Sequence, residues 1–268
     1  MINLNDIEQK LESSLNSERL IAAEACKKIN VPESKIRKWI NMESWSWRLA
    51  AIYACFNKEV VDLEILNKGI LDKDYGVQDA AAELCCILTI PTEVISEWIE
   101  SNDWRLRRAA MCTCTGERYS DIEKLLDFGL ADACSDVIVA AAKACKGAGV
   151  PFIKIREWAK SKLWPERLAA IYSCIGRVDI YPLETIEKRL TDCDKLVSFT
   201  AIESCRGIPA PRAKIINWAK SDLWQKRAAA MAAAIGRSDV PEEVIESGTK
   251  DKNDRVRKYA YEADQTGI

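Results

Sequence analysis

The chain has 268 residues, 48% of them hydrophobic and 30% charged, and its 39 Lys and Arg nearly balance its 41 Asp and Glu, which argues against a generally basic nucleic-acid-binding protein. The absence of histidine excludes histidine-ligated metal sites, Ser-His-Asp triads and histidine proton shuttles. Eleven cysteines without a signal peptide, and no apolar run of about 18 residues, favour a cytoplasmic protein with reduced thiols and no membrane contact.

Four segments, taken in chain order, carry one pattern without gaps. Each has Pro, then Trp seven residues later, Trp after six more and Arg after three more, and the segments are 32–48, 91–107, 151–167 and 211–227. The first Trp column, which we expect in the core, is Trp39, Trp98, Trp158 and Trp218. The second Trp column is Trp45, Trp104, Trp164 and Trp224. Steps of 59 and 60 residues between successive members indicate an internal repeat.

A shorter period lies inside the long one. A cysteine column with steps of 29 to 31 residues runs through Cys26, Cys55, Cys85, Cys114, Cys145, Cys174 and Cys205. Units that contain the Trp pair alternate with units that carry an aspartate five residues before a valine, and these aspartates are Asp72, Asp132, Asp192 and Asp251. About nine units of about 30 residues therefore cover the chain. We call the two kinds Trp-type and Asp-type units.

Each unit is predicted to be a helical hairpin. The stretch 48–55 contains no Gly or Pro and is rich in Ala, which suits a closely packed helix. Upstream, prolines such as Pro32 fit the first turn of a shorter amphipathic helix. Gly116, Gly176 and Gly236 are predicted C-caps of the Ala-rich helices. No alternating strand pattern is present, so we expect about 18 helices.

The Asp-type pattern resembles a known helical repeat. The stretches 251–260 and 72–81 read Asp-x-x-x-x-Val-[Arg/Gln]-x-x-Ala, which is similar to the second helix of HEAT-like repeats. The resemblance implies an all-α, right-handed α-α superhelix of about nine hairpins over residues 1–268, as one domain. It also implies a convex layer of first helices and a concave layer of second helices. It identifies a fold and is silent on function.

The Arg that follows each second Trp has two interpretations. A row of guanidinium groups could face an anionic partner. The favoured interpretation is a structural ladder, because a regular column suits the stacking of repeats, and in HEAT-like repeats the equivalent Arg often bonds the Asp or loop carbonyls of a neighbouring unit. Trp47 interrupts its column, whose other members are Leu106, Glu166 and Lys226, so we expect it to be an exposed aromatic residue.

Specificity is expected at positions of the second helices that vary between units. In the Trp-type units these positions form a stripe with i, i+3 and i+7 spacing, including 46, 49 and 53, and Arg105 to Arg108 make a basic cluster near the middle of the array. The candidate binding residues are Trp47, Tyr53, Arg105, Arg107, Arg108, Arg167, Tyr172, Lys226 and Arg227. The column cysteines are expected to be buried fillers, whereas Cys134 and Cys193 lie near turns and are the thiols to test for reactivity.

These features favour a protein that binds a protein or peptide on its concave face and acts as a scaffold. Complete coverage by repeats, the missing histidines and the lack of catalytic spacings point away from an enzyme. Cysteine spacings such as Cys85-Cys86 are not those of zinc sites, so no metal and no cofactor are expected. The oligomeric state stays open.

The alternative is a DNA-binding or DNA-repair protein. The segment 98–110, WIESNDWRLRRAA, is similar to the Trp-x-x-Ser-Asp-Asn-x-Trp-x-Arg-Arg stretch of the HEAT-like alkylpurine DNA glycosylases. That resemblance implies excision of alkylated purines without a cofactor, through a carboxylate beside aromatic residues. The Trp spacing is one residue shorter here, and Asn102 occupies the position of the family's catalytic Asp. Asp103 or Asp222 would then have to supply the carboxylate.

Overall fold

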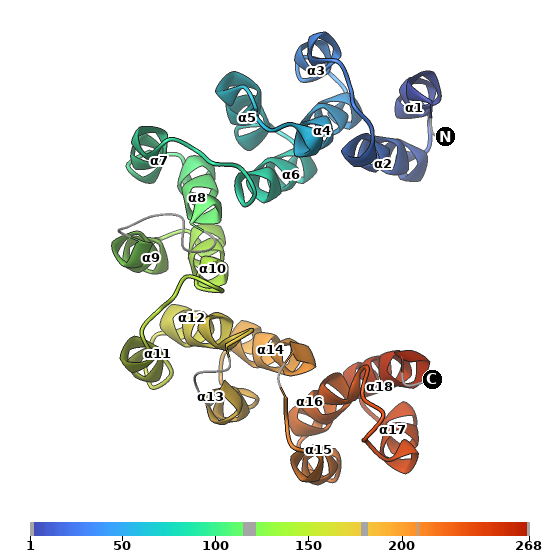
Figure 1. Cartoon of the computed structure of the whole chain (residues 1–268), viewed down its shortest axis with the longest axis vertical. Helices are drawn as coiled ribbons and strands as arrows, with labels where there is room; N and C mark the ends of the chain where they lie inside the picture. Colours follow the sequence, from blue (N-terminus) through green and yellow to red (C-terminus); the bar gives the residue numbers. More distant parts are fainter. Residues whose placement is uncertain (1–2, 115–121, 178–181, 208, 267–268) are drawn as a thin grey trace. The chain divides into compact units, whose positions relative to one another are not determined.

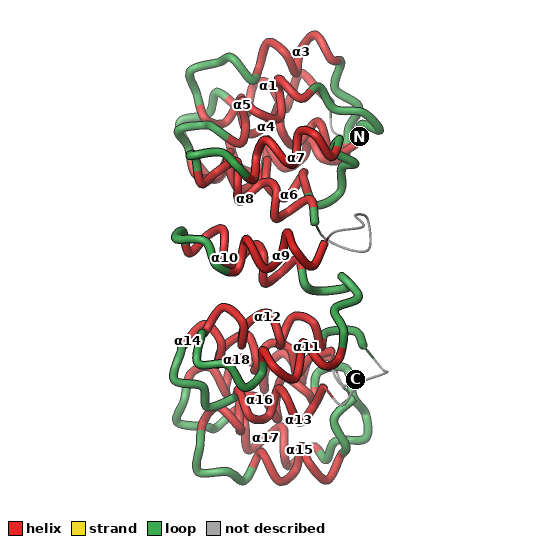
Figure 2. Tube along the Cα trace, turned by 90° about the vertical axis from the view of Figure 1, so that its left-hand side faces the viewer, coloured by secondary structure: helices red, strands yellow, loops and turns green. Residues whose placement is uncertain are grey.

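The computed structural model describes residues 3–114, 122–177, 182–207 and 209–266. These residues form 18 α-helices and three short 3-10 helices, and they contain no strand, which confirms the predicted all-α class (Figure 2). None of the helices in these ranges is both long enough and apolar enough to cross a membrane. Contacts divide the chain into two compact units. The expectation of one domain over residues 1–268 stays a prediction.

The N-terminal unit comprises residues 1–114 and 132–140. Its helices are α1 (Leu4–Leu11), α2 (Asn16–Ala25), α3 (Glu33–Trp39), α4 (Trp45–Ala54), α5 (Leu63–Ile70), α6 (Tyr75–Cys85), α7 (Thr92–Ile99) and α8 (Trp104–Thr113). Within this unit, α1, α3, α5 and α7 form one layer, and α2, α4, α6 and α8 form the other (Figure 1). Each first helix packs against the second helix that follows it, and successive second helices pack against each other. The residues of α10 (Ser135–Ala144) are divided between the two units.

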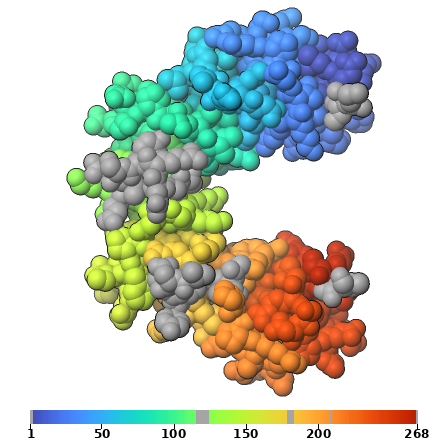
Figure 3. Space-filling model, in the orientation of Figure 1, coloured from blue at the N-terminus to red at the C-terminus, as the bar shows by residue number. Residues whose placement is uncertain are grey.

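The C-terminal unit comprises residues 115–131 and 141–268. Its helices are α9 (Ile122–Leu130), α11 (Phe152–Trp158), α12 (Trp164–Cys174), α13 (Pro182–Arg189), α14 (Lys195–Ser204), α15 (Arg212–Ala219), α16 (Trp224–Ala234), α17 (Glu242–Thr249) and α18 (Asp254–Thr266). From α11 onward the same layering recurs, with odd-numbered first helices on one side and even-numbered second helices on the other (Figure 1). In the space-filling view, the segments of each unit follow one another in chain order (Figure 3).

The two layers are held together by the columns seen in the sequence. The first Trp column is buried, as predicted, with Trp39 and Trp218 each only 2% exposed. The second helices contribute alanines such as Ala50 and Ala229, which are fully buried and allow neighbouring helices to approach closely. Burial of each large indole contributes apolar area that a single hairpin could not cover alone.

The helix ends follow local chemistry with one shift from expectation. Pro32 and its counterparts are the N-caps of the Trp-type first helices, one residue before the predicted first turn, because they keep an extended ψ near 140°. Gly176 and Gly236 adopt φ of 78° and 71° directly after the last caps of α12 and α16, as the C-cap prediction requires. Gly116, also expected to end a helix, lies outside the described residues.

Candidate binding surface

An Arg of each Trp-type second helix binds the Asp of the next unit. Arg Nε and Nη2 contact the two carboxylate oxygens at 2.6 to 3.1 Å, and the four pairs are Arg48–Asp72, Arg107–Asp132, Arg167–Asp192 and Arg227–Asp251. Both Asp192 and its partner Arg167 are buried, with side chains 1% and 6% exposed. The favoured structural ladder is therefore what these four arginines build.

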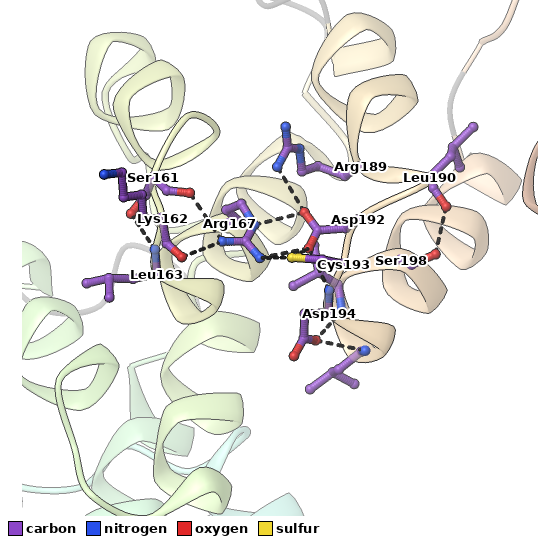
Figure 4. Close-up of polar contacts among 12 residues, drawn as sticks. Ser161, Lys162, Leu163, Arg167, Arg189, Leu190, Asp192, Cys193, Asp194 and Ser198 are labelled. Atoms are coloured by element: carbon purple, nitrogen blue, oxygen red, sulfur yellow. Dashed lines mark hydrogen bonds and ion pairs between the residues drawn. The ribbon is translucent and has the colours of Figure 1, made fainter.

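Each ladder Arg also closes the turn of its own unit. In α12, Nη1 of Arg167 donates to the carbonyls of Ser161 at 3.2 Å and Lys162 at 2.8 Å, while the other nitrogens contact Asp192 (Figure 4). The carboxylate of Asp192 in turn accepts from the backbone N–H of Asp194 at 2.9 Å, in an Asx-type turn just before α14, whose N-cap is Asp194. One guanidinium thus ties two consecutive hairpin turns together.

Electrostatics of the ladder favour the charged carboxylates. Burial by itself would raise the pKa of Asp192, but hydrogen bonds from Arg167 and the Asp194 N–H, with the charges of Arg167 and Arg189, hold this pKa below its usual range. Asp132 follows the same balance, and its pKa is also lowered. The pKa of Asp251 is lowered mainly by its hydrogen bond from Arg227.

The ladder changes the role of three predicted binding residues. The guanidinium groups of Arg107, Arg167 and Arg227 contact the aspartate of the next repeat unit. They also donate to turn carbonyls of their own repeat unit. Their side chains are 18%, 6% and 13% exposed, which leaves little surface for an anionic ligand. The interpretation of this column as a row facing a partner is not supported by the geometry.

Trp47 was expected to be exposed, and this expectation is wrong. Its ring is 7% exposed and lies 5.3 Å from the ring of Trp39, with the planes tilted by 58°. The column of Trp47 faces the first-helix layer, so a large aromatic residue there fills the space between layers. Lys226 occupies the same column in α16, is half-buried and acts electrostatically on Glu187 of α13. Neither residue is available on the second-helix surface.

The basic cluster of α8 is neutralised by neighbouring carboxylates. Arg105 forms a two-point ion pair with Asp103, at 2.9 and 2.6 Å, and Arg108 pairs with Asp79 of α6. Asp103 is the N-cap of α8, and its pKa is lowered by the side chain of Arg105, with the backbone N–H of Arg105 adding to the effect. A carboxylate occupied in this way is poorly suited to act as a free base. Asp222, the other candidate, is exposed at the turn before α16.

A systematic difference separates the second helices of the two unit types. None of the Trp-type second helices, α4, α8, α12 and α16, contains an exposed residue. The flanking helices α2, α6, α14 and α18 each expose several side chains. The predicted specificity stripe is therefore mostly covered in the Trp-type units, where Ser46, Leu49 and Leu168 are buried. At the equivalent stripe positions of the other units, residues such as Glu24, Glu83 and Glu203 are exposed.

The covered helices lie beneath contacts between their neighbours. Lys27, after α2, donates to Glu83 of α6 at 3.2 Å, and these residues flank α4. Lys27 Nζ also sits 4.2 Å from the ring centre of Tyr53, a predicted binding residue of α4. In the C-terminal unit, the hydroxyl of Tyr259 in α18 donates to Glu203 of α14, and these residues flank α16. The alanines of α16 permit close approach of the helices on either side of it.

Tyr172 is half-buried and does not project freely from α12. Burial is the main cause of its raised pKa, which a hydrogen bond with Thr200 of α14 partly offsets. Tyr53 has a raised pKa for the same first reason, with Glu24 and Glu83 adding to it. Both tyrosines are therefore only partly accessible to a partner.

We use the name open face for a set of nine exposed side chains of the second-helix layer. They are Leu20, Glu24, Tyr75, Asp79, Glu83, Lys143, Glu203, Arg255 and Lys258. They include carboxylates, cations, an aliphatic residue and an aromatic residue, so the chemistry is mixed. Arg255 stacks over the ring of Phe199 at 3.7 Å, which holds this cation at the surface of the C-terminal unit.

The open face differs from the residues expected to form it. Sequence reasoning selected variable positions of the Trp-type units and missed Glu24, Glu83, Lys143 and Glu203. These four residues lie two positions before the cysteine column, in the same stripe, within the other units. Comparing that position across all nine units would have identified them.

The thiols behave as the sequence predicts. All seven column cysteines are buried, and each of Cys55, Cys114 and Cys205 points its sulfur at the carbonyl four residues earlier. Cys193 is exposed, and Cys134 is half-buried. Among the described residues, no group of three or more cysteine or carboxylate side chains is arranged to hold a metal ion.

Comparison with known proteins adds no family to these findings. Neither a model of a known protein family nor a curated protein matches the sequence. The likenesses to HEAT-like repeats and to alkylpurine DNA glycosylases therefore rest on the motifs alone. Function must be argued from the surface itself.

Proposed function

We propose that the chain is a HEAT-like α-α superhelix of about nine helix pairs that acts as a scaffold and binds a protein partner on its open face. The repeat pattern supports the superhelix, because it covers essentially the whole sequence at one period. A stacked array of this kind offers an extended surface formed by one layer of helices. No part of the proposal requires a catalytic group.

The main observation behind the proposal is that the two unit types have different structural roles. Trp-type units hold the array together through buried tryptophans and ladder arginines, and their second helices contain only buried and half-buried residues. Asp-type units and α2 supply the exposed side chains. A surface made by one class of unit and varied between repeats suits recognition, since the framework residues need not change.

The charges of the open face favour a protein over a nucleic acid. Glu24, Glu83 and Glu203 lie among its cations, and these carboxylates would repel a phosphate backbone. Arg105 and Arg108, expected to make a basic patch, are paired with Asp103 and Asp79. A protein surface with charges of both signs can complement such a mixture.

Affinity purification with matched charge reversals tests the proposal. The open-face triple variant is Glu24→Lys, Lys143→Glu and Lys258→Glu. The control triple variant is Glu97→Lys, Lys124→Glu and Lys220→Glu, at exposed positions of the first-helix layer. The two variants have the same change in net charge.

We expect a partner, identified by mass spectrometry from the native host, to be lost from the open-face variant and retained by the control. Equal retention or equal loss would contradict the assignment of the surface. Titration of labelled duplex DNA at two salt concentrations examines the alternative, and salt-sensitive binding there would favour a nucleic-acid partner.

A further inference from the structure

Ion pairs close some of the gaps between first helices. Between α3 and α5, Arg37 binds Glu33 and Asp62 at 2.7 and 2.6 Å. In the same gap, Lys68 donates to Glu64 and to the side chain of Asn41, both at 2.9 Å. Arg37 and Lys68 therefore both have acceptors from the chain.

The equivalent gap between α11 and α13 has lost most of these acceptors. Counting from Pro151 and from Asp192, the positions of Glu33, Asn41 and Asp62 are taken by Phe152, Lys160 and Pro182. The cations at the positions of Arg37 and Lys68 are retained as Arg156 and Lys188. A further cation, Arg189, stands where the other Asp-type units have Gly69, Gly129 and Gly248.

A pocket of about 400 Å³ opens in this gap. We call it the basic groove, and its charged and aromatic lining residues are Phe152, Arg156, Lys160, Glu184, Lys188 and Arg189. Four cations face one carboxylate, a net charge of +3. The volume is within the range of pockets that bind small ligands.

The cations of the basic groove are only partly compensated. Lys188 pairs with Glu184 at 2.7 Å, and Arg189 Nη1 pairs with Asp192 at 2.9 Å. Arg156 lies over the ring of Phe152 at 5.6 Å, and neither Arg156 nor Lys160 forms an ion pair with any residue that the structure describes. The net positive charge therefore stays at the surface of the groove.

Arg189 gives the groove a feature that surface lysines lack. The Nε of Arg189 is buried and has no hydrogen-bond acceptor among the described residues. A glycine is preferred at this position because the helix packs tightly, and a Cβ on Gly69 would overlap Ile52 Cδ1 and lie 3.0 Å from the Cβ of Ala81. An arginine in this position is a departure that packing alone does not favour.

The positive charge of the groove lowers the pKa of Glu184, the one carboxylate among its lining residues. The hydrogen bond from Lys188, the charge of Lys188 and the charge of Arg156 hold the pKa of Glu184 below its usual range. An anion that entered the groove would meet the same field. Guanidinium groups such as those of Arg156 and Arg189 match phosphate oxygens geometrically.

We propose that the basic groove between α11 and α13 binds a small phosphate-bearing anion. The groove belongs to the first-helix layer, so this site is separate from the open face and does not depend on the partner proposed there. Phosphate oxygens would accept from Arg156, Lys160 and Arg189, which the chain leaves under-compensated. The ring of Phe152 forms an apolar wall beside them.

Isothermal titration calorimetry of the full chain with inorganic pyrophosphate at low ionic strength tests the site. The variant Lys160→Asn restores the residue of the equivalent gap, and Lys220→Asn makes the same change at the matching exposed position of α15. We expect saturable binding of one pyrophosphate, weakened about fivefold or more by Lys160→Asn and unaffected by Lys220→Asn.

A second variant, Arg156→Ser, carries the residue found at this position in α7, Ser96, and is expected to weaken binding as well. Far-UV circular dichroism checks that each variant keeps its helices. Absence of saturable binding to the wild-type chain would overturn the proposal. So would an affinity that Lys160→Asn and Arg156→Ser leave unchanged, or that Lys220→Asn lowers equally.

Discussion

Arg167 and Asp192 meet through two hydrogen bonds, of 2.8 and 2.7 Å, although they belong to consecutive repeat units. Because Arg167 also binds two carbonyls of its own turn, the pair fixes the relative position of two hairpin turns. A buried pair of this geometry stabilises strongly only while both partners are present. Each Arg–Asp pair of the ladder therefore stabilises the stacking of repeat units only while both residues are present.

Replacing Asp192 by Asn should destabilise the C-terminal unit. The buried guanidinium of Arg167 would keep its carbonyl acceptors and lose its countercharge, at a cost of about 3 kcal/mol in the free energy of unfolding. Urea unfolding followed by circular dichroism measures the change. Glu246→Gln, which breaks an exposed pair with Lys250, should leave the urea midpoint unchanged. Similar midpoints for both variants would contradict the role of the ladder.

Acid should weaken the ladder in a defined direction. The pKa values of Asp132, Asp192 and Asp251 are lowered in the folded state, so their contribution is complete above the ordinary carboxyl pKa and is lost as pH falls through the lowered values. We expect stability to fall below about pH 4. The difference in the free energy of unfolding between the wild type and Asp192→Asn should become smaller as the pH falls over that range. A constant difference from pH 7 to pH 3 would argue against the charged pair.

Gly248 should not tolerate a methyl group. A Cβ at this position would overlap Met231 Sδ and lie 2.9 Å from the Cβ of Ala260, so Gly248→Ala should cost about 1–3 kcal/mol through overpacking between α17 and its neighbours. Thermal unfolding compares it with Gly76→Ala at the exposed start of α6. Because alanine favours helices, Gly76→Ala should be neutral or slightly stabilising. A neutral Gly248→Ala would show that α17 does not pack this closely.

The thiols should divide into protected and accessible groups. Burial raises the pKa of Cys205 to about 12 and that of Cys174 to about 11, so these sulfurs stay protonated and covered at pH 8. Cys193 is exposed and should react quickly with Ellman's reagent. Cys193→Ser should remove one equivalent from the fast phase. Rapid reaction of column cysteines without denaturant would contradict their burial.

Much of the fold could be predicted because period and burial coincide. Trp39 and its counterparts recur at steps of 59 and 60 residues, and a large apolar residue at a fixed repeat position must be covered in every unit. The helix count and the absence of strands in the described residues follow from the same periodicity. The direction in which Trp47 points was not predictable from its column, because the other members are Leu106, Glu166 and Lys226, which share no common polarity.

The surface was harder to predict because exposure depends on neighbouring helices. The repeat position of Leu49 and Leu168 varies between Trp-type units. Both leucines are nevertheless buried, since the helices on either side cover the Ala-rich helix that carries them. Charge counting along α8 overlooked Asp79 and Asp103, which neutralise its arginines. The sequence shows that Arg189 replaces a glycine found in the other Asp-type units. The role of Arg189 could not be predicted, because it depends on the neighbouring helix α11.

Photo-crosslinking in the native host tests the assignment of the open face most directly. A benzophenone amino acid is placed at Tyr75, which is 53% exposed on α6, or at Ile153, which is 73% exposed on α11 in the first-helix layer. The account predicts a crosslinked protein adduct from position 75 and none from position 153. Adducts from position 153 alone, or a nucleic-acid adduct from position 75, would contradict it.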